Sequence, residues 1–117
     1  MEGPRNSILV VEDDPSLRLL ARVNLELEGF TVREAASLGE AHVALDEERP
    51  DVVFLDVHLG NEQSDELLDH LTAVGIPVVL VSGTADADSY RARATEVLAK
   101  PYAPEALIDA AKRLAVG

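Results

Sequence analysis

The sequence predicts an α/β fold: a doubly wound, five-stranded parallel sheet with helices on both faces. Short apolar runs alternate with segments of helical spacing five times along the 117-residue chain. Repeated β-α units favour a parallel sheet between two helical layers. The runs are continuous rather than alternating, which is typical of strands buried on both faces. A chain of this length predicts one domain, residues 1–117, with an ordered core over about residues 7–115.

Five apolar runs supply the predicted strands. The three strongest cover residues 7–11, 51–55 and 77–81, and each is rich in valine and leucine or isoleucine. The weaker runs at residues 30–32 and 97–99 predict short or edge strands.

The first helix is predicted over residues 15–28 from the signals at its ends. Asp14 is placed to cap the helix, Pro15 suits its first turn, and Gly29 suits its exit. Helical spacing predicts one apolar face toward the sheet. We expect that face to carry Leu17, Leu20, Ala21, Asn24 and Leu27.

The second and third helices also have start and stop signals. Ser37 and Glu40 have the spacing of a capping box at the start of the second helix. Ser64 or Asp65 begins the third helix, and Gly75 ends it.

Two more helices complete the alternation. The fourth is short and polar, over residues 86–94, and Pro104 begins the fifth. Nothing remains after the fifth helix, so we expect no output domain. The inward-facing residues predicted for the fifth helix are Leu107, Ile108, Ala111 and Leu114.

The net charge of −12, from 22 acidic and 10 basic residues, limits the partners. Such a field repels phosphate backbones and attracts cations, so we expect no nucleic acid partner. The absence of cysteine excludes a disulfide, a thiolate metal site and a thiol nucleophile. No apolar run has the length of a membrane span or the form of a signal peptide, so we expect a cytoplasmic protein with no membrane partner.

Polar side chains follow four of the predicted strands, at the point where each strand ends. The carboxyl ends of parallel strands meet at one edge, so these side chains should converge there. Clustered carboxylates stay ionised only beside a cation, and Mg²⁺ takes carboxylates, water and phosphate oxygens. A carboxylate can attack phosphorus, and a metal, a lysine and a hydroxyl lower that barrier. The polar residues are Glu12, Asp13, Asp14, Asp56, Ser82, Thr84 and Lys100, and Gly83 stands between Ser82 and Thr84.

Four motifs at these positions resemble the receiver domains of response regulators, the CheY-like family. They are Val-Val-Glu-Asp-Asp-Pro at residues 10–15, Leu-Asp-Val at 55–57, Val-Ser-Gly at 81–83 and Ala-Lys-Pro at 99–101. Each motif is weak alone, whereas all four in order make a specific signal. The resemblance covers residues 8 to about 114 and implies a flavodoxin-like fold.

The resemblance implies a role for each matching acid and for the lysine. Asp56 would accept the phosphoryl group. Asp13 would bind Mg²⁺ directly, together with Asp56 and the backbone carbonyl of His58, while Glu12 would hold the metal through water. Lys100 would pair with the phosphoryl oxygens.

The fourth strand would supply the rest of the phosphoryl site. Ser82 would move to hydrogen-bond the phosphoryl oxygens, and Gly83 would let them approach the backbone. Thr84 and His58 occupy positions that in this family tune the loss of the phosphoryl group. Ser82 could instead be an ordinary loop hydroxyl, and Asp14 suits a helix cap better than a metal ligand.

The chain departs from the family pattern at three positions. Gly60 stands where a proline is usual, and Ser64 where a glycine is usual. Val97 replaces the aromatic residue that normally couples to the hydroxyl shift, so that switch cannot operate in its usual form. Tyr102 is a candidate substitute for this aromatic residue.

The resemblance implies a signalling domain of a two-component system rather than an enzyme. A histidine kinase or phosphotransfer protein would phosphorylate Asp56, and the chain would act on a downstream protein or as a phosphate sink. We expect a monomer or weak dimer that assists only its own phosphorylation and dephosphorylation. One alternative is a pseudo-receiver, which binds proteins without taking phosphate. A haloacid-dehalogenase-like phosphatase is disfavoured, because His58 stands where that class has its second acid.

Overall fold

Five parallel strands form one sheet in the computed structural model, which describes residues 6–59, 62–83, 94–100 and 102–115. Their order is β2-β1-β3-β6-β7, so the direction of winding reverses between β1 and β3. Both weaker predicted runs form edge strands. The bounds are β1 Ser7–Val11, β2 Thr31–Ala35, β3 Val52–Asp56, β6 Val78–Ser82 and β7 Glu96–Ala99.

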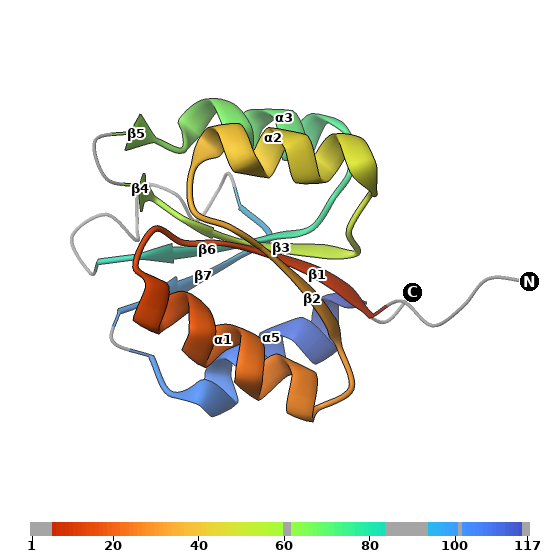
Figure 1. Ribbon diagram of the computed structural model, residues 1–117, viewed down its shortest axis with the longest axis vertical. Helices are drawn as coiled ribbons and strands as arrows, with labels where there is room; N and C mark the ends of the chain where they lie inside the picture. Colours follow the sequence, from red (N-terminus) through yellow and green to blue (C-terminus); the bar gives the residue numbers. More distant parts are fainter. Residues whose placement is uncertain (1–5, 60–61, 84–93, 101, 116–117) are drawn as a thin grey trace, which may run out of the picture.

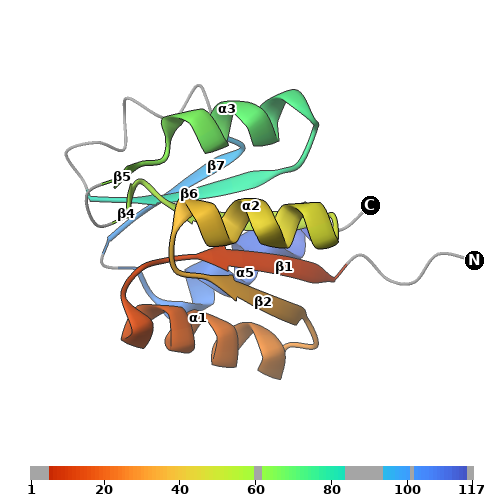
Figure 2. The ribbon, with the colours of Figure 1, turned by 45° about the horizontal axis from the view of Figure 1, so that its top comes forward.

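Helices cover both faces of this sheet. α1 (Pro15–Leu27) and α5 (Pro104–Ala115) lie on one face, and α2 (Leu38–Glu47) and α3 (Asp65–Ala73) lie on the other (Figure 1). The same two layers are visible in the turned view of Figure 2. The predicted doubly wound α/β fold is therefore confirmed. The predicted helix at residues 86–94 lies almost entirely outside the described residues, and no helix in the described part is long and apolar enough to cross a membrane.

The alternation of side chains along the central strands divides the core in two. In β1, Leu9 and Val11 belong to the cluster that includes residues of α2 and α3. Ile8 and Val10 belong to the cluster that includes residues of α1 and α5. Because both faces of the strand are buried, the sequence shows a continuous apolar run.

Two central strands end one residue later than predicted. β3 ends at Asp56 rather than at residue 55, and β6 ends at Ser82 rather than at residue 81. The polar side chains suggested loops, but the sheet ladder continues through them: Asp56 pairs with Val81, and Ser82 pairs with Ala99. Both polar residues are therefore held by the sheet.

The buried face of α1 differs from the predicted one. Ala21 is buried as predicted, but so is Leu25, which was not predicted, whereas the predicted Leu20 and Leu27 are exposed. Apolar residues lie on several sides of this helix, so spacing alone did not distinguish the stripe through Leu20 and Leu27 from the stripe through Ala21 and Leu25. The predicted cap is confirmed, because the Asp14 carboxylate accepts hydrogen bonds from two backbone N–H groups of the first turn.

The inward face of α5 is also only partly as predicted. Ile108 and Leu114 are half-buried rather than buried. Small side chains fill the closest positions against the sheet, which a search for large apolar residues overlooks. The buried residues of α5 are Leu107, Ala110, Ala111 and Ala115.

The loop between β3 and α3 contains a short hairpin that the sequence did not predict. β4 (His58–Leu59) pairs antiparallel with β5 (Glu62–Gln63). α3 begins directly after this hairpin, with Ser64 as its N-cap residue. Two-residue strands lie below the length at which an apolar pattern can be recognised.

We expect Leu25→Ala to destabilise the protein far more than Leu27→Ala. Leu25 is 0% exposed and Leu27 is 78% exposed. Truncating a buried leucine costs about 2–5 kcal/mol of unfolding free energy, whereas a surface truncation changes it by about 0.5 kcal/mol. Urea unfolding of both variants and wild type checks this. Equal losses for the two variants would show that α1 buries a different face.

Candidate functional site

Five polar side chains converge at the carboxyl ends of four strands. Glu12 and Asp13 follow β1, Asp56 and Ser82 end β3 and β6, and Lys100 follows β7. Glu12 is 6% exposed, Asp56 5% and Ser82 1%, while Asp13 is exposed. The parallel sheet therefore brings predicted site residues together from four separate segments, as expected for this edge of an open α/β sheet.

Lys100 joins the two buried acids. Its Nζ lies 2.9 Å from Oδ2 of Asp56 and 3.5 Å from Oε1 of Glu12. Burial acts to lower the pKa of Lys100, but the hydrogen bond and the charge of Asp56, followed by those of Glu12, outweigh it and raise that pKa. Lys100 is therefore held as a cation between the two acids.

Burial beside another acid perturbs the carboxyl group of Glu12. Burial, followed by the hydrogen bond with Asp56, raises the pKa of Glu12 from 4.5 to about 7. The backbone N–H of Asp14, 3.1 Å from Oε2 of Glu12, and the charge of Lys100 act in the opposite direction. One ammonium group thus compensates only part of the negative charge gathered there.

The three acids also form a group suited to a cation. Carboxylate oxygens of Glu12, Asp13 and Asp56 lie within 4.8 Å of one another. In the part of the chain that the structure describes, no other group of three or more potential ligands lies this close. Carboxylate oxygens are hard ligands of the kind that Mg²⁺ prefers. The donor set and the excess negative charge both fit a divalent cation.

Hydroxyl groups fix the backbone around Asp56 and Ser82. The Ser64 hydroxyl donates to the carbonyl oxygen of Asp56 at 2.5 Å, and the Ser82 hydroxyl donates to the carbonyl oxygen of Gly83 at 2.8 Å. The backbone N–H of Lys100 donates to the carbonyl oxygen of Ser82 at 2.7 Å. Sequence reasoning assigned Ser64 to a helix start and to a position where a glycine is usual, and it missed this hydrogen bond because the partner lies eight residues earlier in another element.

The hydrogen bonds and ion pairs described above do not involve the side chains of four residues that the sequence singled out. Thr84 and Pro101 lie outside the described residues. His58 is the first residue of β4, two residues after Asp56, and the role of its carbonyl stays a prediction. Gly83 is exposed, and a Cβ there would meet nothing within 4 Å. Its predicted role depends on a phosphoryl group rather than on the packing of the chain itself.

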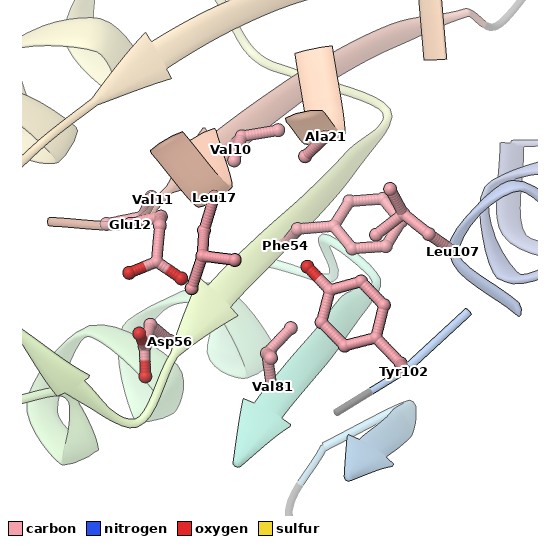
Figure 3. Close-up of a pocket in the computed structure, with 10 residues that line it drawn as sticks. All are labelled: Val10, Val11, Glu12, Leu17, Ala21, Phe54, Asp56, Val81, Tyr102 and Leu107. Atoms are coloured by element: carbon pink, nitrogen blue, oxygen red, sulfur yellow. The ribbon is translucent and has the colours of Figure 1, made fainter. Parts of the chain in front are cut away.

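Tyr102 borders the same site from one side of the sheet. It lines a cavity of about 10 Å³ with Glu12 and Asp56, and Figure 3 shows its hydroxyl turned toward the side of the cavity where these acids lie. Burial, followed by the charge of Glu12, raises the pKa of Tyr102. Tyr102 packs on the cluster of α1 and α5, whereas Val97 packs on the cluster of α2 and α3. Tyr102 therefore does not occupy the place of the aromatic residue that Val97 replaces.

Comparison with known proteins identifies one family over most of the chain. The family model of the response regulator receiver domain matches residues 8–112. A phosphate regulon transcriptional regulatory protein, PhoB of Pseudomonas aeruginosa, is 29% identical over 87% of this chain and 48% of its own length. The DNA-binding response regulator MtrA of Mycolicibacterium smegmatis is 32% identical over 92% of this chain and 50% of its own length. The chain thus spans about half the length of these two relatives.

Solved structures agree with this comparison. The receiver domain of NtrX from Brucella abortus is 33% identical, with a TM-score of 0.84 over 92% of this chain and 97% of that one. A CheY-like receiver domain protein from Methanospirillum hungatei is 28% identical, with a TM-score of 0.83 over 94% and 93% of the two chains.

The raised pKa of Glu12 predicts a pH-dependent stability. The folded chain holds this proton up to about pH 7, whereas the ordinary pKa is 4.5. Between those values the folded state binds more protons than the unfolded state, so stability falls as pH rises. We expect metal-free wild type to lose stability relative to Glu12→Gln over this interval. Urea unfolding in a chelator at several pH values measures the difference, and a difference independent of pH would contradict the prediction.

Proposed function

The chain belongs to the response regulator receiver domains of two-component systems, and on that premise we propose that it accepts a phosphoryl group on Asp56 in a reaction that requires Mg²⁺. The observation that carries this proposal is the position of the Asp56 carboxylate. It lies 2.9 Å from the Lys100 ammonium and within 4.8 Å of the carboxylates of Glu12 and Asp13. A nucleophilic carboxylate, a fixed cation and a metal-binding acid group are therefore combined at one point.

The proposed donor is a phosphohistidine of a histidine kinase or phosphotransfer protein. An oxygen of the ionised Asp56 carboxylate attacks the phosphorus and forms a P–O bond. The P–N bond of the donor breaks, and its electron pair stays on the imidazole nitrogen, which leaves as neutral histidine after taking up a proton. The product is an aspartyl phosphate. Lys100 supports this step, since its raised pKa keeps a positive charge beside the reacting carboxylate.

The proposed metal ligands are those that the acid group provides. Asp13 and Asp56 would bind Mg²⁺ directly with the His58 carbonyl, and Glu12 would act through water. When bound, Mg²⁺ offsets the negative charge on the oxygens of the transferring group. Glu12 supports the assignment, because a buried carboxyl with a pKa of about 7 gains most from a nearby cation.

The proposed switch begins with the hydroxyl of Ser82. Its hydrogen bond to the Gly83 carbonyl has to break before the hydroxyl can donate to a phosphoryl oxygen. Ser82 is the last residue of β6, and its carbonyl oxygen accepts a hydrogen bond from the backbone N–H of Lys100 after β7. A shift of Ser82 would therefore displace the ends of both β6 and β7. Val97 in β7 has no aromatic ring that could follow the hydroxyl, so we propose that the change lies in the backbone of Ser82 and Gly83, where β6 ends.

The partners are proposed from the charge and the family. With a net charge of −12 the chain itself is unsuited to nucleic acid, although MtrA is named as a DNA-binding regulator. We propose a cytoplasmic monomer or weak dimer that acts through a protein partner or as a phosphate sink, and not as an enzyme on other substrates. A pseudo-receiver is the weaker alternative, because Lys100 and Asp56 keep the contact that a phosphoryl site requires.

We expect Asp13→Asn to weaken Mg²⁺ binding and phosphorylation, while Asp14→Asn leaves both intact. Asparagine at position 14 keeps the helix cap that Asp14 provides and removes only its charge. Mg²⁺ should raise the Tm of wild type and Asp14→Asn, since a ligand that binds only the native state stabilises it. It should raise the Tm of Asp13→Asn much less.

Phosphorylation by acetyl phosphate is followed on the same three proteins. We expect Asp13→Asn to react at least about tenfold more slowly than the other two at a common Mg²⁺ concentration, which corresponds to the loss of about 1.4 kcal/mol of transition-state stabilisation. Equal Tm shifts and equal rates for Asp13→Asn and wild type would remove Asp13 from the metal site.

A further inference from the structure

Among the helices that the structure describes, α2 and α3 each begin at a serine N-cap, and the two hydroxyl groups make different hydrogen bonds. Ser37 is the N-cap of α2, and its Oγ accepts from the backbone N–H of Glu40 at 3.1 Å. Ser64 is the N-cap of α3, but its side chain makes no capping hydrogen bond. The Ser64 hydroxyl instead donates to the carbonyl oxygen of Asp56 at 2.5 Å. The first turn of α3 therefore lacks the usual side-chain cap, because the Ser64 hydroxyl forms a hydrogen bond with the end of β3 instead.

Ser64 also closes the hairpin between Asp56 and α3. Its backbone N–H donates to the carbonyl oxygen of Val57 at 3.3 Å, and its own carbonyl accepts from the N–H of Leu68 at 2.9 Å. Directly before it, β5 pairs with β4 through Gln63 and His58. Ser64 is 2% exposed, so water does not compete for these groups. One residue thus joins the strand end, the hairpin and the helix start.

We infer that Ser64 is a positioning residue for Asp56, a role that rests on the function proposed above. The side chain of Asp56 has to meet Lys100 and the metal-binding acids at once, and its direction follows from the peptide that carries it. The Ser64 hydroxyl fixes the carbonyl of that peptide at the last residue of β3. The Ser64 backbone N–H in turn donates to the carbonyl of Val57, which lies between Asp56 and His58, and the carbonyl of His58 is a proposed metal ligand.

Loss of the hydrogen bond between the Ser64 hydroxyl and the Asp56 carbonyl should lower Mg²⁺ affinity and the rate of phosphorylation, and not only the stability of the fold. Without the hydroxyl, the peptide after β3 gains freedom while β3, β6 and α3 remain packed. Small displacements of a nucleophile have large effects on rate, about 100-fold for about 1 Å. Ser64 is not proposed to contact the phosphoryl donor or the metal, so it acts only through Asp56 and the hairpin.

The test compares Ser64→Ala with Ser37→Ala, which removes a serine whose hydroxyl caps its own helix instead of bonding to β3. Mg²⁺ affinity is measured by calorimetry, and the rate of phosphorylation by acetyl phosphate is measured at saturating Mg²⁺, at a temperature where all variants are folded. We expect Ser64→Ala to bind Mg²⁺ several-fold more weakly and to react at least about tenfold more slowly. Ser37→Ala should lower the Tm and leave both site properties as in wild type.

Ser64→Thr serves as the second variant, because it keeps the hydroxyl. Ser64→Thr should retain most of the Mg²⁺ affinity and phosphorylation rate that Ser64→Ala loses. If Ser64→Ala does not fold, the comparison of Ser64→Thr with wild type tests the inference in its place. Wild-type affinity and rate in folded Ser64→Ala would overturn the inference while leaving the proposed function intact, as would a folded Ser64→Thr that loses both. Wild type that neither binds Mg²⁺ nor takes a phosphoryl group would overturn the proposed function, and this inference with it.

Discussion

Two buried carboxylates share one ammonium group at the edge of this sheet, and the rest of the site depends on that arrangement. Glu12 and Asp56 are almost fully buried, and Lys100 lies within hydrogen-bond reach of both. Two acidic side chains face one ammonium group there, and burial, together with the neighbouring Asp56, raises the pKa of Glu12. Exposed Asp13 adds a third carboxylate at the mouth of the site. A divalent ion would offset this excess of negative charge and so allow a negatively charged phosphoryl group to bind beside the acids.

The parallel sheet makes this arrangement possible. Lys100 is 44 residues from Asp56 and 88 residues from Glu12 along the chain, yet all three stand at strand ends on one edge. The side chains that carry the chemistry sit on or beside the last sheet residues, where the ladder restricts their backbone. Ser82 belongs to the same ladder and is linked to Lys100 through its carbonyl. A change at the phosphoryl site would therefore reach the ends of β6 and β7 directly.

Much of the fold and of the site could be predicted from the sequence because both follow from order along the chain. Continuous apolar runs identified the central strands, and the polar residues after them identified the site, since parallel strands end at one edge. Three-dimensional packing decided what the sequence left open. α1 has apolar residues on several sides, so only the structure shows that Leu25 rather than Leu27 is buried. Ser64 has the position of an ordinary cap, and its bond to Asp56 depends on the path of the hairpin between them.

Intact mass after incubation with acetyl phosphate shows whether Asp56 accepts a phosphoryl group in a Mg²⁺-dependent reaction. Wild type and Asp56→Asn are compared with Mg²⁺ and with a chelator. We expect wild type with Mg²⁺ to gain a single phosphoryl mass that is lost over time, and the other three samples to gain none. Equal addition to Asp56→Asn, or no addition to wild type that is shown to bind Mg²⁺, would contradict this expectation.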